Sequence, residues 1–170
     1  LDTQALDETK NNYIMCIVYI ADRYGVAIAD ISTGDYFVTE LPDSSRLMDE
    51  IYKFSPSEII CNEAFYMSGM DLDAMRDKLG ITIYSLDSWY FDDAVCKDKL
   101  LEHFKVKNFA GLGLADYDCG IISAGALLIY LFETQKNSLS NLTHITPYIT
   151  GKYMLIDSST RRNLELCETC

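Results

Sequence analysis

Basic side chains are scarce in this chain of 170 residues. It has 14 lysines and arginines against 26 aspartates and glutamates, which gives a formal net charge of −12 and an isoelectric point near 4.4. Proteins bind nucleic acid mainly through cationic side chains that neutralise phosphates and release counterions. We therefore expect this chain by itself not to bind DNA.

A long apolar run is also lacking. The most apolar stretch, residues 119–133, falls short of the ~20 residues that a membrane-spanning helix needs, and we interpret it as a buried helix. Small residues at 123–126 would let another element approach it closely. No charged segment followed by an apolar stretch opens the sequence, so we expect no signal peptide and a cytoplasmic location. The first residue is Leu, and we expect an excised part of a longer protein.

The six cysteines supply neither a complete metal site nor the pattern of a disulfide framework. Cys16 and Cys61 lie in apolar runs, where a free thiol behaves as a small hydrophobic side chain. Cys167 and Cys170 have the C-x-x-C spacing of zinc and redox sites. A structural zinc site needs two further ligands, and neither a second C-x-x-C pair nor paired histidines are present. We therefore attribute this spacing to chance.

Motifs for nucleotide binding and for histidine-based catalysis are absent from the sequence. The glycine-containing segment 111–113 has neither the further glycines nor the Gly-Lys-Ser/Thr end of a phosphate-binding loop, so we predict a tight turn. The two histidines, His103 and His144, lie in a charged helical segment and in a polar segment. We expect both to be solvated.

The residues that are present predict an α/β domain with a mixed sheet. Three apolar runs at 13–21, 25–33 and 36–41 are joined by short turns, which is typical of an antiparallel meander. Helix and strand patterns follow: a helix at 45–54, a strand at 58–62, a helix at 70–79, a strand at 81–86, and helices at 87–104 and 119–133. This order resembles the ribonuclease H-like arrangement, in which parallel strands follow an antiparallel meander and helices cover both faces.

The helix predicted at 87–104 has two distinct faces. Its expected buried face consists of Trp89, Phe91, Val95, Leu100 and Phe104. The charged side chains between them are left to face solvent, and a charged surface of this kind needs no partner to explain it.

The last part of the chain is more polar. Residues 137–151 contain a proline among serines, threonines and asparagines, so we predict a linker there. Residues 152–156 form a short apolar run that indicates a strand. Residues 157–166 begin with four possible helix-capping side chains, and we expect the first turns of a helix.

A two-metal nuclease site is an alternative function for a sheet of this kind. Such a site needs several carboxylates around two ions ~4 Å apart, with one carboxylate on the first strand. The first predicted strand, residues 13–21, contains none. The nearest candidates are Asp22, Asp30, Glu50 and Glu63, which we interpret as surface or turn residues.

Five segments resemble the MutS family of DNA mismatch-recognition ATPases. They are DETKNNY at 7–13, ADISTGDYFVTE at 29–40, GLGL at 111–114, GALLIYLFETQK at 125–136 and MLIDSSTRRNLEL at 154–166. The resemblance covers essentially the whole chain. It implies a connector domain at 13–138, preceded by a linker at 1–12 and followed by a linker at 139–152 and by the truncated start of the core (lever) domain at 153–170.

The motifs that carry the family's two activities are missing. Members of the family read mismatches with a Phe-x-Glu motif and hydrolyse ATP with a Walker A loop, and this sequence contains neither. The resemblance therefore implies a non-catalytic fragment without a cofactor of its own. ATP and Mg²⁺ would belong to the absent C-terminal domain of a parent that binds mismatched DNA and forms homodimers.

The resemblance also implies two sets of contact residues. In the family, a helix matched here by residues 92–104 is part of the surface that recruits MutL. The candidates for this surface are Lys97, Asp98, Lys99 and Glu102. The candidates for contacts between the connector and the core domain are Thr160, Arg161, Arg162, Asn163 and Leu164.

Overall fold

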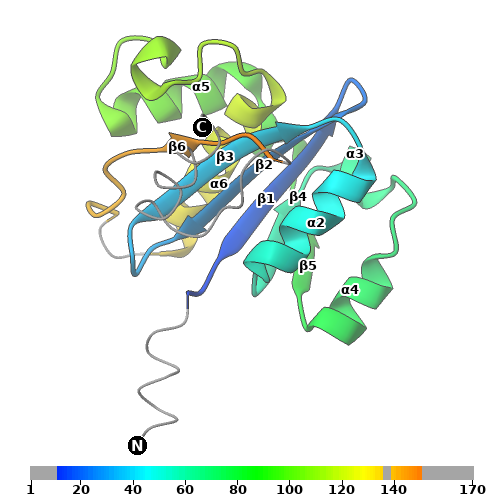
Figure 1. Cartoon of the computed structure of the whole chain (residues 1–170). Helices are drawn as coiled ribbons and strands as arrows, with labels where there is room; N and C mark the ends of the chain where they lie inside the picture. Colours follow the sequence, from blue (N-terminus) through cyan, green and yellow to red (C-terminus); the bar gives the residue numbers. More distant parts are fainter. Residues whose placement is uncertain (1–10, 136–138, 151–170) are drawn as a thin grey trace, which may run out of the picture.

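The structure is a computed structural model that describes residues 11–135 and 139–150. Its centre is a six-stranded sheet with the strand order β5-β4-β1-β2-β3-β6 (Figure 1). The strands are β1 (Ile14–Ile20), β2 (Arg23–Asp30), β3 (Asp35–Leu41), β4 (Glu58–Cys61), β5 (Thr82–Ser85) and β6 (Thr146–Pro147). The first three strands form an antiparallel meander, whereas β4, β5 and β6 each run parallel to the strand that they join. This order and these directions confirm the predicted ribonuclease H-like arrangement.

Helices cover both faces of the sheet, as predicted. They are α2 (Ser44–Phe54), α3 (Glu63–Tyr66), α4 (Leu72–Leu79), α5 (Asp93–Phe104) and α6 (Cys119–Thr134), with 3-10 turns at η1 (Ser88–Phe91) and η2 (Phe109–Leu112). One face carries α2, α3 and α4, and the other carries α5 and α6 (Figure 1). Successive side chains of a strand point to opposite faces. Met15 and Ile17 of β1 therefore join the core under α2, while Cys16 and Val18 join the core under α6.

The central helix of its layer is α6, which packs directly on β1, β2 and β3. Gly25 of β2 permits this packing, because a Cβ atom there would lie 2.2 Å from the carbonyl oxygen of Cys119. Gly125 permits the close approach of α5 in the same way, since a Cβ atom there would lie 2.5 Å from the Cβ of Cys96. Within residues 11–135 and 139–150, no helix is long and apolar enough to cross a membrane.

The single helix predicted at 87–104 is divided in two. Residues 88–91 form the turn η1, and Asp92 then starts α5 by accepting a hydrogen bond from the backbone N–H of Val95 at 3.0 Å. Because α5 starts anew at Asp92, Cys96 and Leu100 become the residues that face α6.

The predicted buried face of this helix is therefore wrong at two positions. Trp89 is 49% exposed and Val95 is 45% exposed. Leu100 is buried as predicted, and Phe91 and Phe104 are partly buried against the same core.

The segment 139–150 is not a linker as far as the structure describes it. Leu139, Leu142, Ile145 and Tyr148 are buried, and β6 adds a parallel edge strand to β3 through the pairs Phe37↔Thr146 and Val38↔Pro147. The polar residues that suggested a linker lie between these four apolar residues, which recur every third position. The predicted strand at 152–156 and the predicted helix start at 157–166 lie outside the described residues, and the domain boundaries stay predictions.

Candidate functional site

The four charged residues predicted to contact MutL all lie on α5. They are Lys97, Asp98, Lys99 and Glu102. The last three of them line a shallow depression of about 450 Å³ together with Val95 and Leu101. Lys97 lies outside this lining, and its ammonium group forms an ion pair at 3.0 Å with Asp93 one turn earlier. The helix thus brings three of the four residues to one surface.

The end of α6 contributes an aromatic ring to the same region. The ammonium nitrogen of Lys99 lies 3.9 Å from the ring centroid of Phe132, which is 41% exposed. The ring of His103 meets Phe132 edge to face at 5.5 Å, and its Nε2 lies 2.8 Å from the carbonyl oxygen of Leu142 and donates a hydrogen bond to it. His103 is therefore half-buried and hydrogen-bonded within the domain, and the expectation that it is solvated is wrong.

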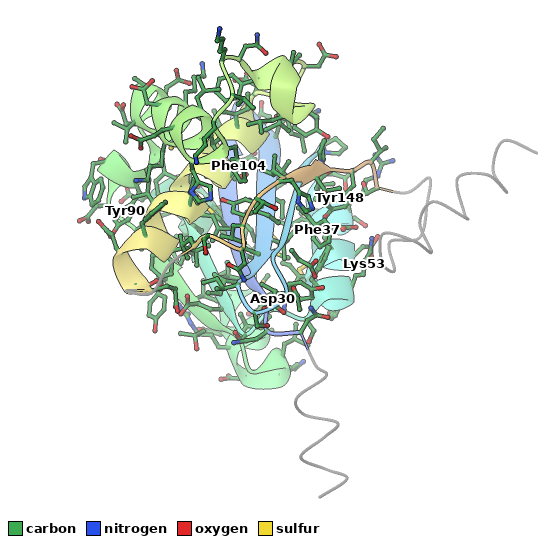
Figure 2. The ribbon with its side chains drawn as sticks, turned by 90° about the vertical axis from the view of Figure 1, so that its left-hand side faces the viewer. Asp30, Phe37, Lys53, Tyr90, Phe104 and Tyr148 are labelled. Atoms are coloured by element: carbon green, nitrogen blue, oxygen red, sulfur yellow. The ribbon has the colours of Figure 1, made fainter. Side chains whose placement is uncertain are left out.

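Next to these residues, η1 presents a fixed aromatic pair. The ring of Trp89 stacks on Tyr90 with a centroid distance of 3.9 Å, and the Tyr90 hydroxyl donates a hydrogen bond to the carboxylate of Glu133 on α6 (Tyr90 is labelled in Figure 2). This hydrogen bond, together with burial, raises the pKa of Tyr90 to about 12. We call Trp89, Val95 and Phe132 the exposed apolar patch: they are exposed apolar side chains on η1, α5 and α6, and these three segments pack on one another.

Acidic side chains predominate on the segments that carry the exposed apolar patch. Residues 87–102 together with Glu133 contain six exposed carboxylates and two lysines. The carboxylates are Asp87, Asp92, Asp93, Asp98, Glu102 and Glu133. Both lysines already have a partner, since Lys97 pairs with Asp93 and Lys99 lies over Phe132. These segments therefore present exposed apolar side chains among an excess of negative charge, which we call the acidic rim.

Asp30, one of the possible nuclease ligands, is a buried residue that anchors a neighbouring segment. It is 2% exposed and accepts hydrogen bonds from the Asn11 side chain at 2.9 Å, from the Asn12 backbone at 3.0 Å, and from the backbone and hydroxyl of Ser32 at 3.0 and 2.6 Å. Burial acts to raise the pKa of this carboxyl group, but the hydrogen bonds from Ser32, Asn11 and Asn12 outweigh it and leave the pKa below its ordinary value. Asp30 is therefore not a surface residue, but the turn interpretation is confirmed, because its carboxylate accepts from the backbone N–H of Ser32 and its carbonyl oxygen accepts from that of Gly34.

Glu50 on α2 is buried to the same extent and anchors the segment 139–150. Its carboxylate accepts a hydrogen bond from the Tyr148 hydroxyl at 2.9 Å and lies 3.2 Å from the ammonium group of Lys53 (Figure 2 labels Tyr148 and Lys53). The Tyr148 ring packs against Phe37 and Phe54 at centroid distances of 6.3 and 6.1 Å. Burial, followed by the nearby Glu50 carboxylate, raises the pKa of Tyr148 well above its ordinary value. The surface interpretation of Glu50 is wrong as well.

The candidate nuclease ligands do not come together. Asp30 ends β2, beside the start of β1, whereas Glu63 follows β4, whose last residue pairs with Ile17 in the second half of β1. Glu50 is engaged by Tyr148 under α2, and Asp22 is exposed in the turn between β1 and β2. In the part of the chain that the structure describes, no three His, Cys, Asp or Glu side chains are grouped so that they could hold a metal ion.

Residues 12–146 match the family description "MutS domain II". Over 169 residues, which is 99% of this chain, it is 52% identical to the DNA mismatch repair protein MutS of Lachnoclostridium phytofermentans. The chain belongs to the MutS family. The MutS proteins of Ruminiclostridium cellulolyticum and Acetivibrio thermocellus are 36% and 37% identical to it, each again over 99% of the chain.

The chain spans about a fifth of the length of these MutS relatives. It covers 18% of the Lachnoclostridium protein and 19% of each of the other two. Among solved structures, a chain of Thermus thermophilus RuvC in complex with a Holliday junction substrate is similar with a TM-score of 0.48 and 14% identity, over 74% of this chain and 96% of that chain. The strand order β5-β4-β1-β2-β3-β6 and the strand directions define the fold of this chain independently of that similarity.

Some residues predicted from the likeness to MutS lie outside the described residues. They are Thr160, Arg161, Arg162, Asn163 and Leu164. The C-x-x-C pair Cys167 and Cys170, whose spacing we attribute to chance, lies outside the described residues as well. The cysteines of the described part are buried free thiols. Burial raises the pKa of Cys61 to about 12 and that of Cys16 well above its ordinary value, so the prediction that both behave as small hydrophobic side chains is confirmed.

Proposed function

We propose that this chain contains the non-catalytic connector domain of a MutS-type mismatch-recognition ATPase and joins its mismatch-binding domain to its core domain. The observation that carries this proposal is the match of residues 12–146 to MutS domain II. The parent would bind mismatched DNA, hydrolyse ATP with Mg²⁺ and form homodimers through its other domains. The net charge of −12 supports the proposal that this domain itself does not bind DNA.

The path of the chain through the sheet supports a connecting role. Residues 11 and 12 are held by Asp30 at the end of the sheet where β1 begins. β6 runs parallel to β3, and β3 ends at the opposite end of the sheet, where Tyr148 is held by Glu50. The chain therefore enters and leaves at opposite ends of a rigid sheet, and each crossing point is fixed by a buried carboxylate.

The surface of α5 is the part of the domain that contacts MutL. Asp98, Lys99 and Glu102 line one depression, and Lys97 lies on the same helix. α5 packs on the outside of α6, on the face of the sheet opposite α2, and His103 ties it to the segment that leads into β6 (Figure 1). Asp98 and Glu102 are exposed on α5, so a partner can reach them.

Charge reversal on α5 tests this contact. The double variant Lys97→Glu with Asp98→Lys reverses both charges and keeps the net charge. It should slow association with MutL of the same organism about three- to tenfold and weaken the salt dependence of the association rate. The reason is that charges at the rim of an interface act mainly on the association rate. The measurement is surface plasmon resonance at two salt concentrations, combined with thermal melting.

A matched control lies on the opposite face of the sheet. Asp77→Lys with Lys78→Glu reverses two adjacent exposed charges on α4 and should leave MutL binding unchanged. If the α5 variant binds MutL at the same rate as the wild type, with an unchanged melting temperature, MutL does not bind this helix.

A further inference from the structure

The exposed apolar patch differs from ordinary surface hydrophobic residues. Single exposed apolar side chains are normal on proteins. Here three of them come from three different elements, since Trp89 lies on η1, Val95 on α5 and Phe132 on α6. Trp89 is also the only tryptophan in the chain.

The rings of this patch are held in place before any partner arrives. Trp89 stacks on Tyr90, and Tyr90 is tied to Glu133 by its hydroxyl. Phe132 is covered on one side by Lys99 and bordered by His103. A rigid aromatic side chain loses little conformational entropy on binding, which is one reason why tryptophan is enriched among the residues that dominate binding energy.

The charges around the patch restrict what can bind to it. The segments that carry it hold six exposed carboxylates against two lysines, and both lysines are engaged within the domain, one of them with Asp93. A phosphate backbone or an anionic lipid surface would be repelled. A second copy of this chain would bring two acidic rims together, and like charges facing each other across an interface cost several kcal/mol.

We infer that this patch receives a basic segment of the partner protein, in which lysines or arginines flank one apolar side chain. The apolar side chain contacts Trp89, and the flanking cations pair with the carboxylates of the rim. This inference rests on the proposed function, because it assigns chemistry to the surface that would contact MutL. Trp89 contributes more binding energy than any of the four charged residues on α5.

Trp89→Ala tests the inference directly. Because Trp89 is half exposed, the variant should melt at nearly the wild-type temperature but bind MutL at least about tenfold more weakly, the loss typical of a central interface residue. Tyr52→Ala is the matched control, since Tyr52 is 61% exposed on α2 on the opposite face of the sheet and should leave the affinity unchanged. Val95→Ala is a second variant of the patch and should weaken binding in the same direction.

A spectroscopic measurement reports on the contact itself. With 5-fluorotryptophan incorporated into this chain, its single ¹⁹F resonance should shift on addition of unlabelled MutL. At equal, subsaturating MutL it should shift less for the same chain carrying the α5 charge reversal. A short peptide in which lysines flank one leucine should shift it as well, whereas the same peptide with glutamates in place of the lysines should not.

The outcomes separate this inference from the proposed function. If charge reversal on α5 weakens MutL binding while Trp89→Ala and Val95→Ala do not, the patch is not the anchor and the inference is wrong. If neither the charge reversal nor the patch variants change MutL binding, the proposed contact on α5 is wrong too. Equal shifts with the basic and the acidic peptide would exclude charge-selective recognition.

Discussion

Asp30 and Glu50 are buried equally, at 2% exposure each, but they are stabilised by different kinds of partner (both regions appear in Figure 2). Asp30 is surrounded by neutral donors, namely an amide side chain, two backbone N–H groups and a hydroxyl. Glu50 has one hydroxyl donor and one cation, and its hydroxyl partner belongs to a tyrosine that is itself packed among aromatic rings.

The difference shows two ways to fix a chain segment to a sheet. Residues 11 and 12 are fixed mainly by hydrogen bonds to the charge of Asp30, beside bonds from Asn11 to Asp35 and from Ser57 to the Asn12 side chain. This anchor therefore weakens when Asp30 is protonated. The segment 139–150 is fixed mainly by the buried ring of Tyr148, and the charge of Glu50 serves to satisfy that ring's hydroxyl. The first anchor should therefore respond to pH and the second to the loss of apolar volume.

Removal of the Tyr148 ring should have the largest effect. Tyr148→Ala deletes an aromatic side chain that is 6% exposed, and truncations of this kind lower the free energy of unfolding by about 3–5 kcal/mol. Urea denaturation measures this loss, and hydrogen exchange should show faster exchange throughout 139–150. A loss below about 1 kcal/mol would mean that the ring adds little to the fold. Tyr52→Ala, at an exposed position on α2, is the control for tyrosine truncation as such.

The Asp30 anchor should be weaker and dependent on pH. Asp30→Ala leaves four hydrogen bonds to a charged group unmade and should cost about 2–3 kcal/mol near neutral pH. Because the pKa of Asp30 is lowered on folding, its contribution is complete above the unfolded value of ~3.9 and is lost as the pH falls through the lower folded value. The stability difference between wild type and variant, measured by urea denaturation from pH 7 to pH 2, should therefore be constant above about pH 5 and shrink below about pH 4. A difference that does not change with pH would show that Asp30 acts by packing and not by charge.

Removal of the Lys53 cation beside Glu50 should have the smallest effect on stability. Lys53→Gln removes an ion pair in which the carboxylate is buried and the ammonium group is partly exposed, and Tyr148 still donates to Glu50. We expect a loss of about 1 kcal/mol, between the values of exposed and of buried pairs. Lys97→Gln breaks the more exposed Lys97–Asp93 pair at a similar distance and should cost less. Urea denaturation measures the loss of unfolding free energy in each variant. Equal losses would show that burial of the carboxylate does not make the Lys53–Glu50 pair more stabilising than the Lys97–Asp93 pair.

The regular part of the fold could be predicted because its signals are local. The meander at β1 to β3 consists of short apolar runs separated by turns, and α4 begins at the capping Asp71 and ends at Gly80, which has a φ of +68°. The division between η1 and α5 was not predicted, because an aspartate such as Asp92 inside a helical pattern is compatible both with a helix cap and with a solvated side chain. Only the packing of Cys96 and Leu100 on α6 decides between them.

The anchors and the apolar patch could not be predicted for a different reason. Glu50 and Tyr148 are 98 residues apart, and Asp30 and Asn12 are 18 apart, so no local pattern connects them. The exposure of Trp89 depends on which face of the neighbouring helix turns inward, and its large apolar side chain suggested burial. One signal was available in the sequence: the recurrence of apolar residues at every third position from Leu139 to Tyr148 contradicts a linker.

The short strand β6 also affects how the domain behaves at high concentration. A sheet ends in a row of backbone groups that can pair with another molecule, and proteins that leave such an edge long and open tend to aggregate. Here β6 covers one edge by pairing with β3, and the opposite edge is β5, which has only four residues. Tyr148, which fastens the segment after β6, thus also helps to keep the domain monodisperse.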